Sequence, residues 1–200
     1  MGMGSLMGCC GHVMDRTQRS STGFGVGKRI ALYLGLLITA SPAFAGGFGP
    51  WSFGMSADQI QAVTASGPYQ PFSNGDLETY NGDFGGKQEN VQFFLKDGQL
   101  WRIGVSTYEG TDLSAATAAW SHAYSTLQAD YGAMETPHYQ GASLEALAAS
   151  ARAIVAAGGK AQMAPLVQPE SAFVFSSFYS YAHDSTTYYT VTVNYDRPTR

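Results

Sequence analysis

An oxygen-rich segment is the first place in this sequence where the residue types suggest chemistry. It carries five carboxylate or amide side chains: Asn74, Asp76, Glu78, Asn81 and Asp83. Calcium takes about six to eight oxygen ligands, but the spacing differs from that of the helix–loop–helix calcium motif. The Asn-Gly pairs at 74–75 and 81–82 favour tight turns instead. We expect two turns around one short strand, with calcium binding as the alternative.

Three histidines could act as bases in a hydrolytic site: His122, His138 and His183. None of them has an acidic or histidine partner at metal-ligand spacing, and the His183-Asp184 pair is typical of a turn. The Gly-x-Ser-x-Gly motif that presents a serine nucleophile is also missing. We expect no enzyme activity, catalytic residue, metal ligand or cofactor. An envelope hydrolase with an unrecognised site is the alternative.

Aromatic residues are dense near the C-terminus, where five tyrosines lie between positions 179 and 195. Cross-strand aromatic pairs stabilise a sheet by roughly 0.2–1 kcal/mol each. Tyrosine is also favoured where a binding surface is half apolar and half wet. The candidate recognition surface combines three residues expected opposite the main apolar stripes with two near the expected mature N-terminus: Phe94, Phe178, Tyr188, Trp51 and Phe53.

The periodicity of apolar residues predicts the helices that would support these side chains. Apolar residues recur every three or four positions over 112–131, with Trp120 on the apolar face. A second helix is expected at about 143–157. A short helix begins at a capping box headed by Ser56, and Gly67-Pro68 is expected to end it.

Alternation of apolar and polar residues predicts two hairpins. The first spans about 91–107 and turns at Asp97-Gly98. The second spans 173–195 and turns within 182–185. The alternation of its first strand puts four aromatic side chains on one face: Phe173, Phe175, Tyr179 and Tyr181. The segment 158–170, which contains two prolines, is expected to be a loop.

The order of these elements indicates an α+β fold rather than a regular βαβ alternation. We expect a two-layer sandwich, with a mostly antiparallel sheet and two or three helices packed on one face. The helix–hairpin order occurs at 56–108 and again at 143–195. A diverged internal repeat is therefore an open alternative.

Residues 1–45 have the parts of a secretory signal peptide. The basic pair Lys28-Arg29 precedes an apolar run over 30–40, and small residues precede a cut expected after position 45. The run is too short to span a bilayer. These features predict a cleaved leader and a single α+β domain over 46–200, with no transmembrane segment, in a periplasmic or secreted location.

The charge and cysteine content narrow the choice of partners. The formal net charge is −4, and four of the 11 basic residues fall in the expected leader, so the mature chain is more acidic still. Because phosphate binding needs a basic surface, we expect no nucleic-acid partner. Cys9 and Cys10 also fall in the leader, so no thiol remains for catalysis or a thiolate metal site. The start of translation, at Met1 or Met14, stays open.

Residues 51–109 resemble a known small module. The segment Phe53-Gly54-Met55-Ser56 is followed by Gln59 and, later, by the strand pair that turns at Asp97-Gly98. This pattern is similar to the helix-then-meander unit of SmpA/OmlA-type outer-membrane assembly proteins and of β-lactamase-inhibitor-like domains. The resemblance implies a periplasmic, non-enzymatic protein that binds another protein or the envelope. The outer-membrane members carry a lipidated cysteine where this chain has Gly46, which leaves membrane anchoring unsupported.

The expected function is therefore that of an exported, soluble, non-enzymatic binding or envelope-accessory protein. Another envelope protein is the expected partner, and the sequence does not indicate an oligomeric state. A calcium- or carbohydrate-binding domain is the alternative.

Overall fold

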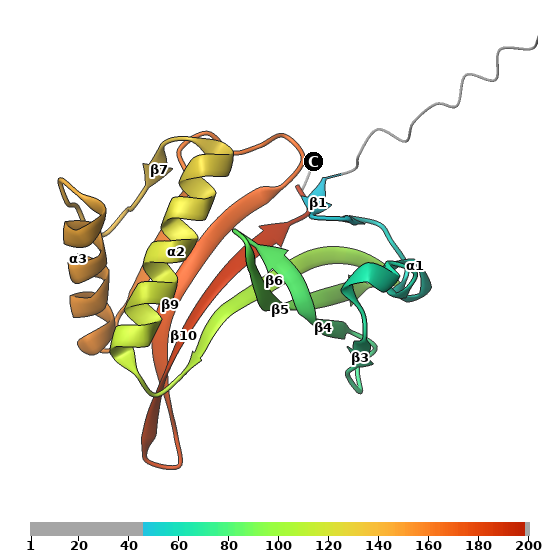
Figure 1. Ribbon diagram of the computed structural model, residues 1–200, viewed down its shortest axis with the longest axis horizontal. Coiled ribbons are helices and arrows are strands. Elements are labelled where there is room, and N and C mark those ends of the chain that lie inside the picture. Colours follow the sequence, from blue (N-terminus) through green and yellow to red (C-terminus); the bar gives the residue numbers. More distant parts are fainter. Residues whose placement is uncertain (1–45, 199–200) are drawn as a thin grey trace, which may run out of the picture. The chain divides into compact units, whose positions relative to one another are not determined.

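An eight-stranded antiparallel sheet forms the centre of the fold in the computed structural model, which describes residues 46–198 (Figure 1). The expected leader, 1–45, and its cut lie outside the described residues. The strand order is β3-β4-β5-β6-β10-β9-β8-β7. The strands, in chain order, are β3 Tyr69–Pro71, β4 Leu77–Phe84, β5 Lys87–Lys96, β6 Gln99–Gly110, β7 Met134–Glu135, β8 Lys160–Pro165, β9 Phe173–His183 and β10 Thr186–Asp196. A separate two-stranded ribbon pairs β1, Gly47–Phe48, with β2, Trp51–Ser52.

Three α-helices accompany the sheet: α1 Ala57–Gln61, α2 Leu113–Tyr131 and α3 Leu144–Ala156. Asp112 caps α2 and Ser143 caps α3, each by accepting a hydrogen bond from a first-turn amide. The predicted α+β two-layer sandwich is confirmed, and so are the positions of these two long helices. No helix among the described residues combines the length and apolar character needed to cross a membrane.

The helix α1 is shorter than predicted. Its capping box forms as expected, with Ser56 and Gln59 bonded reciprocally. The helix ends at Gln61, and a 3-10 turn, η1, Thr64–Ser66, follows it before Gly67-Pro68. The prediction that Gly67-Pro68 ends α1 was therefore wrong.

Strand register determines which side chains form the core. Val91 lies opposite Val105, Val105 opposite Val193, and Val193 opposite Ser176, so one row crosses four strands on a single face. All four side chains are fully buried. The ribbon and the helices cover this face. For example, the Trp51 and Phe93 ring centroids lie 4.8 Å apart.

The sheet order is symmetric about its centre. Each half contains a helix followed by a three-stranded meander, β4-β5-β6 in one half and β8-β9-β10 in the other. The last strands of the two meanders, β6 and β10, pair with each other. Two similar halves thus share one continuous sheet, with a short strand, β3 or β7, on each outer edge.

Two local predictions were wrong because sequence spacing did not reveal strand pairing. Asn81-Gly82 is not a turn: it lies inside β4, and Gly85-Gly86 forms the turn with both φ angles positive. A Cβ atom at Gly82 would overlap Val91, so the glycine is required by packing. The expected loop 158–170 contains β8, which adds to the sheet beside β9.

Candidate binding surface

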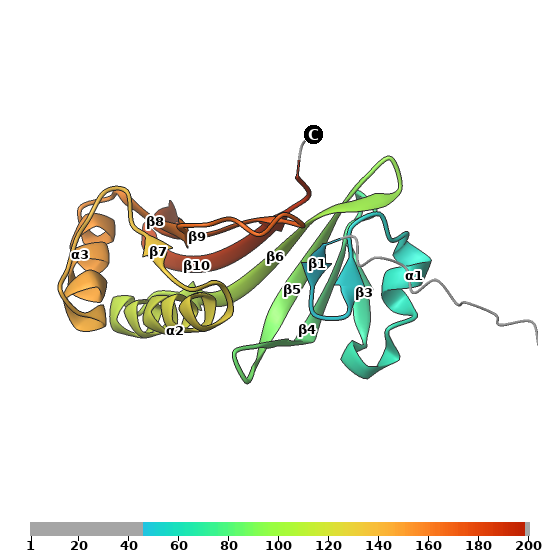
Figure 2. The same ribbon diagram turned by 90° about the horizontal axis from the view of Figure 1, so that it is seen from above.

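Among residues 46–198, no helix lies on one face of the sheet, and we call this face the open face. Figure 2 shows α2 and α3 on the same side of β8, β9 and β10, with the opposite side uncovered. Antiparallel sheets commonly leave one face to solvent, and such faces are mostly polar. The open face here differs because aromatic rings and small hydroxyl side chains lie together over its central strands.

The middle of the open face is a line of small polar side chains, which we call the hydroxyl row. It consists of Ser106 on β6, Thr192 on β10 and Ser177 on β9, which lie opposite one another in the strand register. Ser177 is 2% exposed although no helix covers it. Its hydroxyl accepts a hydrogen bond from Gln162 Nε2 at 3.4 Å, which extends the row to β8.

Aromatic side chains border the hydroxyl row and make it the floor of a groove of about 600 Å³. Phe175 and Tyr179 lie on either side of Ser177 along β9 and are about 13 Å apart at strand spacing. Phe94 lies on β5, and its ring covers Gly104, where an added Cβ atom would come within 3.3 Å of the ring. The groove volume falls within the range typical of small-ligand sites.

Two cationic side chains, Arg102 and Lys160, line the groove. The Arg102 guanidinium donates to both oxygens of Asp196, at 2.5 and 2.6 Å, and this bond raises the pKa of Arg102. Its charge is therefore largely neutralised. Lys160 Nζ lies 5.6 Å from the centre of the Tyr179 ring. None of the described residues that line the groove is acidic, so Lys160 gives the groove a positive bias in an acidic protein.

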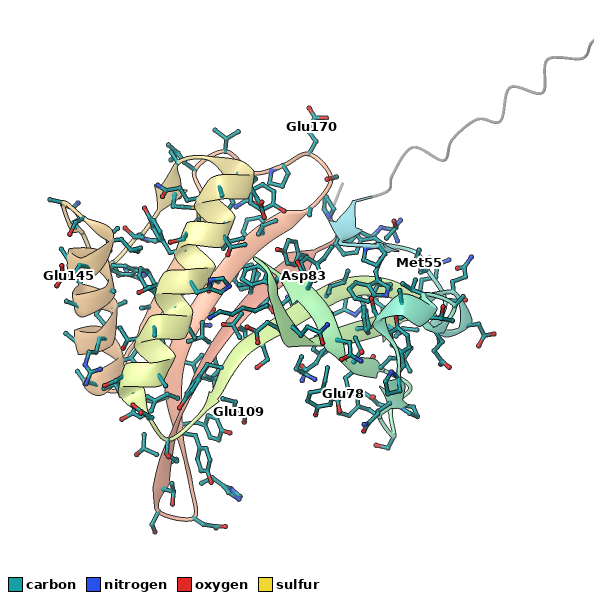
Figure 3. The ribbon with its side chains drawn as sticks, in the orientation of Figure 1. Met55, Glu78, Asp83, Glu109, Glu145 and Glu170 are labelled. Atoms are coloured by element: carbon teal, nitrogen blue, oxygen red, sulfur yellow. The ribbon has the colours of Figure 1, made fainter. Side chains whose placement is uncertain are left out.

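The β9–β10 hairpin extends beyond the rest of the sheet (Figure 1). Near its base, Tyr181 stacks on Tyr188 with ring centroids 5.5 Å apart. The Tyr181 hydroxyl donates to Glu109, which Figure 3 places at the end of β6 beside the hairpin. That hydrogen bond to a carboxylate raises the pKa of Tyr181 to about 12. The contact fixes the hairpin base against the adjoining strand.

The candidate recognition residues do not lie together on one surface. Trp51, Phe53 and Phe178 are 1%, 7% and 0% exposed and belong to the core, so their assignment to an exposed surface was wrong. Phe94 and Tyr188 are partly exposed on the open face.

The sequence pattern of β9 indicated the wrong buried face, and strand pairing gives the physical reason. The pattern of Phe173, Phe175, Tyr179 and Tyr181 resembles a core stripe, yet these side chains lie on the open face. Pairing with β10 decides the orientation, because Val191 faces the core and lies opposite Phe178. The groove aromatics Phe175 and Tyr179 were therefore missed as candidates. The sequence did contain one signal of a partly polar surface on β9, because two serines, at 176 and 177, interrupt its aromatic residues.

The three histidines lie in separate places. His122, on α2, is half-buried against β4, with Nε2 3.3 Å from the Phe84 carbonyl oxygen. His183 Nε2 lies 3.3 Å from Asp184 in the exposed hairpin turn, with both side chains at least 70% exposed. His138 is exposed in the segment before α3. Within the described residues, no hydrogen bond joins any of these histidines to a hydroxyl group.

The oxygen-rich segment is extended rather than coiled around an ion. Asn74 and Asp76 bond to each other, and Asp76 also accepts from the Leu95 amide at 2.7 Å. Figure 3 shows Glu78 and Asp83 at separate places along β4. Among residues 46–198, no group of three or more potential metal-binding side chains is found.

Comparison with known proteins found no matching family model, no matching curated protein and no matching solved structure.

Proposed function

We propose that this chain is an exported, non-enzymatic binding protein that works in the periplasm or outside the cell and uses the open face to hold its ligand. The observation that carries the proposal is the groove on that face. A purely solvated sheet face would not need aromatic rings around a nearly buried serine, Ser177. Ligand sites typically combine such apolar walls with a few convergent polar groups.

Two further observations support this proposal. The leader pattern at 1–45 predicts export, and the first strand of the fold, β1, begins at Gly47, just after the expected cut. The resemblance of 51–109 to periplasmic assembly and inhibitor-like modules points to the same class of non-enzymatic protein.

Export predicts a defined N-terminus. Expressed with its leader in a Gram-negative host, the protein is expected in the periplasmic fraction with a mass corresponding to residues 46–200. Intact-mass analysis measures this directly. A product that keeps residues ahead of Gly46, or that stays in the cytosol, would contradict the export proposal.

The open face can be tested with a photo-crosslinking amino acid. Benzoylphenylalanine at Phe94, beside the groove, is expected to give a discrete adduct in intact cells. The matched control is the same residue at Phe72, which is 43% exposed near the edge strand β3. Mass spectrometry of the crosslinked bands identifies what is captured. Equal adducts at both positions, or none at Phe94, would count against the open face as the ligand surface.

A further inference from the structure

The groove differs from a protein-docking patch in its floor. Its central side chains, Ser106, Thr192 and Ser177, are small and hydroxylated, whereas protein interfaces bury an apolar centre. An amphipathic helix would need an apolar groove. An extended peptide would need free backbone groups, yet β6 and β10 are paired with neighbours on both sides. These features disfavour a peptide as the ligand.

The same floor suits a sugar. A sugar ring has C–H faces that pack on aromatic rings and a rim of hydroxyls that both donate and accept hydrogen bonds. Side-chain amides offer a donor and an acceptor together, and Gln92 and Asn194 line the groove. Phe175 and Tyr179 provide aromatic surface on both sides of the hydroxyl row.

The charges on the groove lining favour an acidic sugar over a neutral one. Asp196 neutralises Arg102, while no carboxylate among the described residues lies within ion-pair distance of Lys160. Of the two cations among the described residues that line the groove, an incoming carboxylate would find Arg102 already paired and Lys160 available, and it would meet no acidic lining residue there. Outside the groove, the net negative charge of the protein repels anions.

We infer that the groove binds an acidic saccharide. Successive sugar rings pack on Tyr179 and Phe175, their hydroxyls bond to Asn194 and the hydroxyl row, and a carboxylate pairs with Lys160. This inference rests on the proposed function and names the ligand class of the same surface.

The test is an NMR titration of the isotope-labelled protein purified from the periplasm. The probes are two acidic disaccharides, one of galacturonate and one containing glucuronate, each beside its neutral counterpart, and a triglutamate peptide. We expect saturable shifts of the Ser106, Thr192 and Ser177 amides with the acidic disaccharides, and weaker binding of the neutral ones. Salt should weaken the acidic binding.

Lys160→Gln is expected to weaken binding of the acidic disaccharides about tenfold and to leave the neutral ones unchanged. The matched control is Lys96→Gln, at the far end of the β5–β6 hairpin, which should bind like the unmodified protein. Thermal melting verifies that both variants fold.

Several results would overturn the inference: no binding of either acidic disaccharide, equal binding of triglutamate, or an unchanged affinity in Lys160→Gln. These outcomes are separable from failure of the proposed function. If the Phe94 crosslink forms while both disaccharides fail to bind, the open face is a ligand surface and the saccharide assignment is wrong.

Discussion

Replacing Trp120 with alanine is expected to lower the free energy of unfolding by about 3–5 kcal/mol. Trp120 is fully buried on α2. Its ring centroid lies 5.6 Å from that of Tyr124 and 5.8 Å from that of Tyr139, which comes from the segment before α3. Truncation would leave a cavity between α2 and the segment before α3, because Tyr124 and Tyr139 cannot fully fill the space. Urea unfolding followed by circular dichroism measures the loss.

The matched control for this variant is Trp101→Ala. Trp101 is only half-buried, and the Arg102 guanidinium lies 4.8 Å from its ring centre. Its removal should cost about 1 kcal/mol. Equal losses in the two variants would show that Trp120 does not anchor α2 as its burial indicates.

Alkaline pH is expected to destabilise the protein steeply above about pH 10. Tyr195 and Tyr139 are 1% and 6% exposed, and burial raises the pKa of each above its ordinary value near 10. Above that pH the unfolded chain releases these protons while the folded chain keeps them. The contribution of these two tyrosines to the free energy of unfolding is therefore complete below about pH 10. As the pH rises further, each tyrosine lowers that free energy by about 1.4 kcal/mol per pH unit.

Urea midpoints between about pH 9 and about pH 11 measure this slope, and tyrosinate absorbance follows the ionisation. Tyr195→Phe should remove about 1.4 kcal/mol per pH unit from this slope, since the phenyl ring has no proton to release. A slope that is the same in Tyr195→Phe would show that other groups control the alkaline transition.

Local signals in the sequence were sufficient for the two long helices and for one turn. Asp112 and Ser143 cap α2 and α3, and a capping side chain acts within its own first turn. The Asp97-Gly98 turn also forms, with both φ angles positive. These features depend on neighbours in the chain and can be predicted without the tertiary fold.

The candidate surface could not be predicted in the same way, because it depends on pairing between distant strands. The side chains of β9 alternate between two faces, and only the pairing of Val191 with Phe178 decides which face is buried. Both faces of β9 carry aromatic residues, so hydrophobicity alone favoured the wrong one. The groove follows from the same register, since Ser106 and Ser177 meet only through β10.

Among the strands of residues 46–198, β10 comes last in the sequence, and it lies at the centre of the sheet between β6 and β9. The ribosome makes it last, and an export channel that threads the chain from its N-terminus delivers it last. Until Thr186–Asp196 emerges, the β4-β5-β6 meander and the β8-β9 strand pair have no strand to join them. If the chain is exported as proposed, completion of the sheet waits until β10 has crossed the membrane.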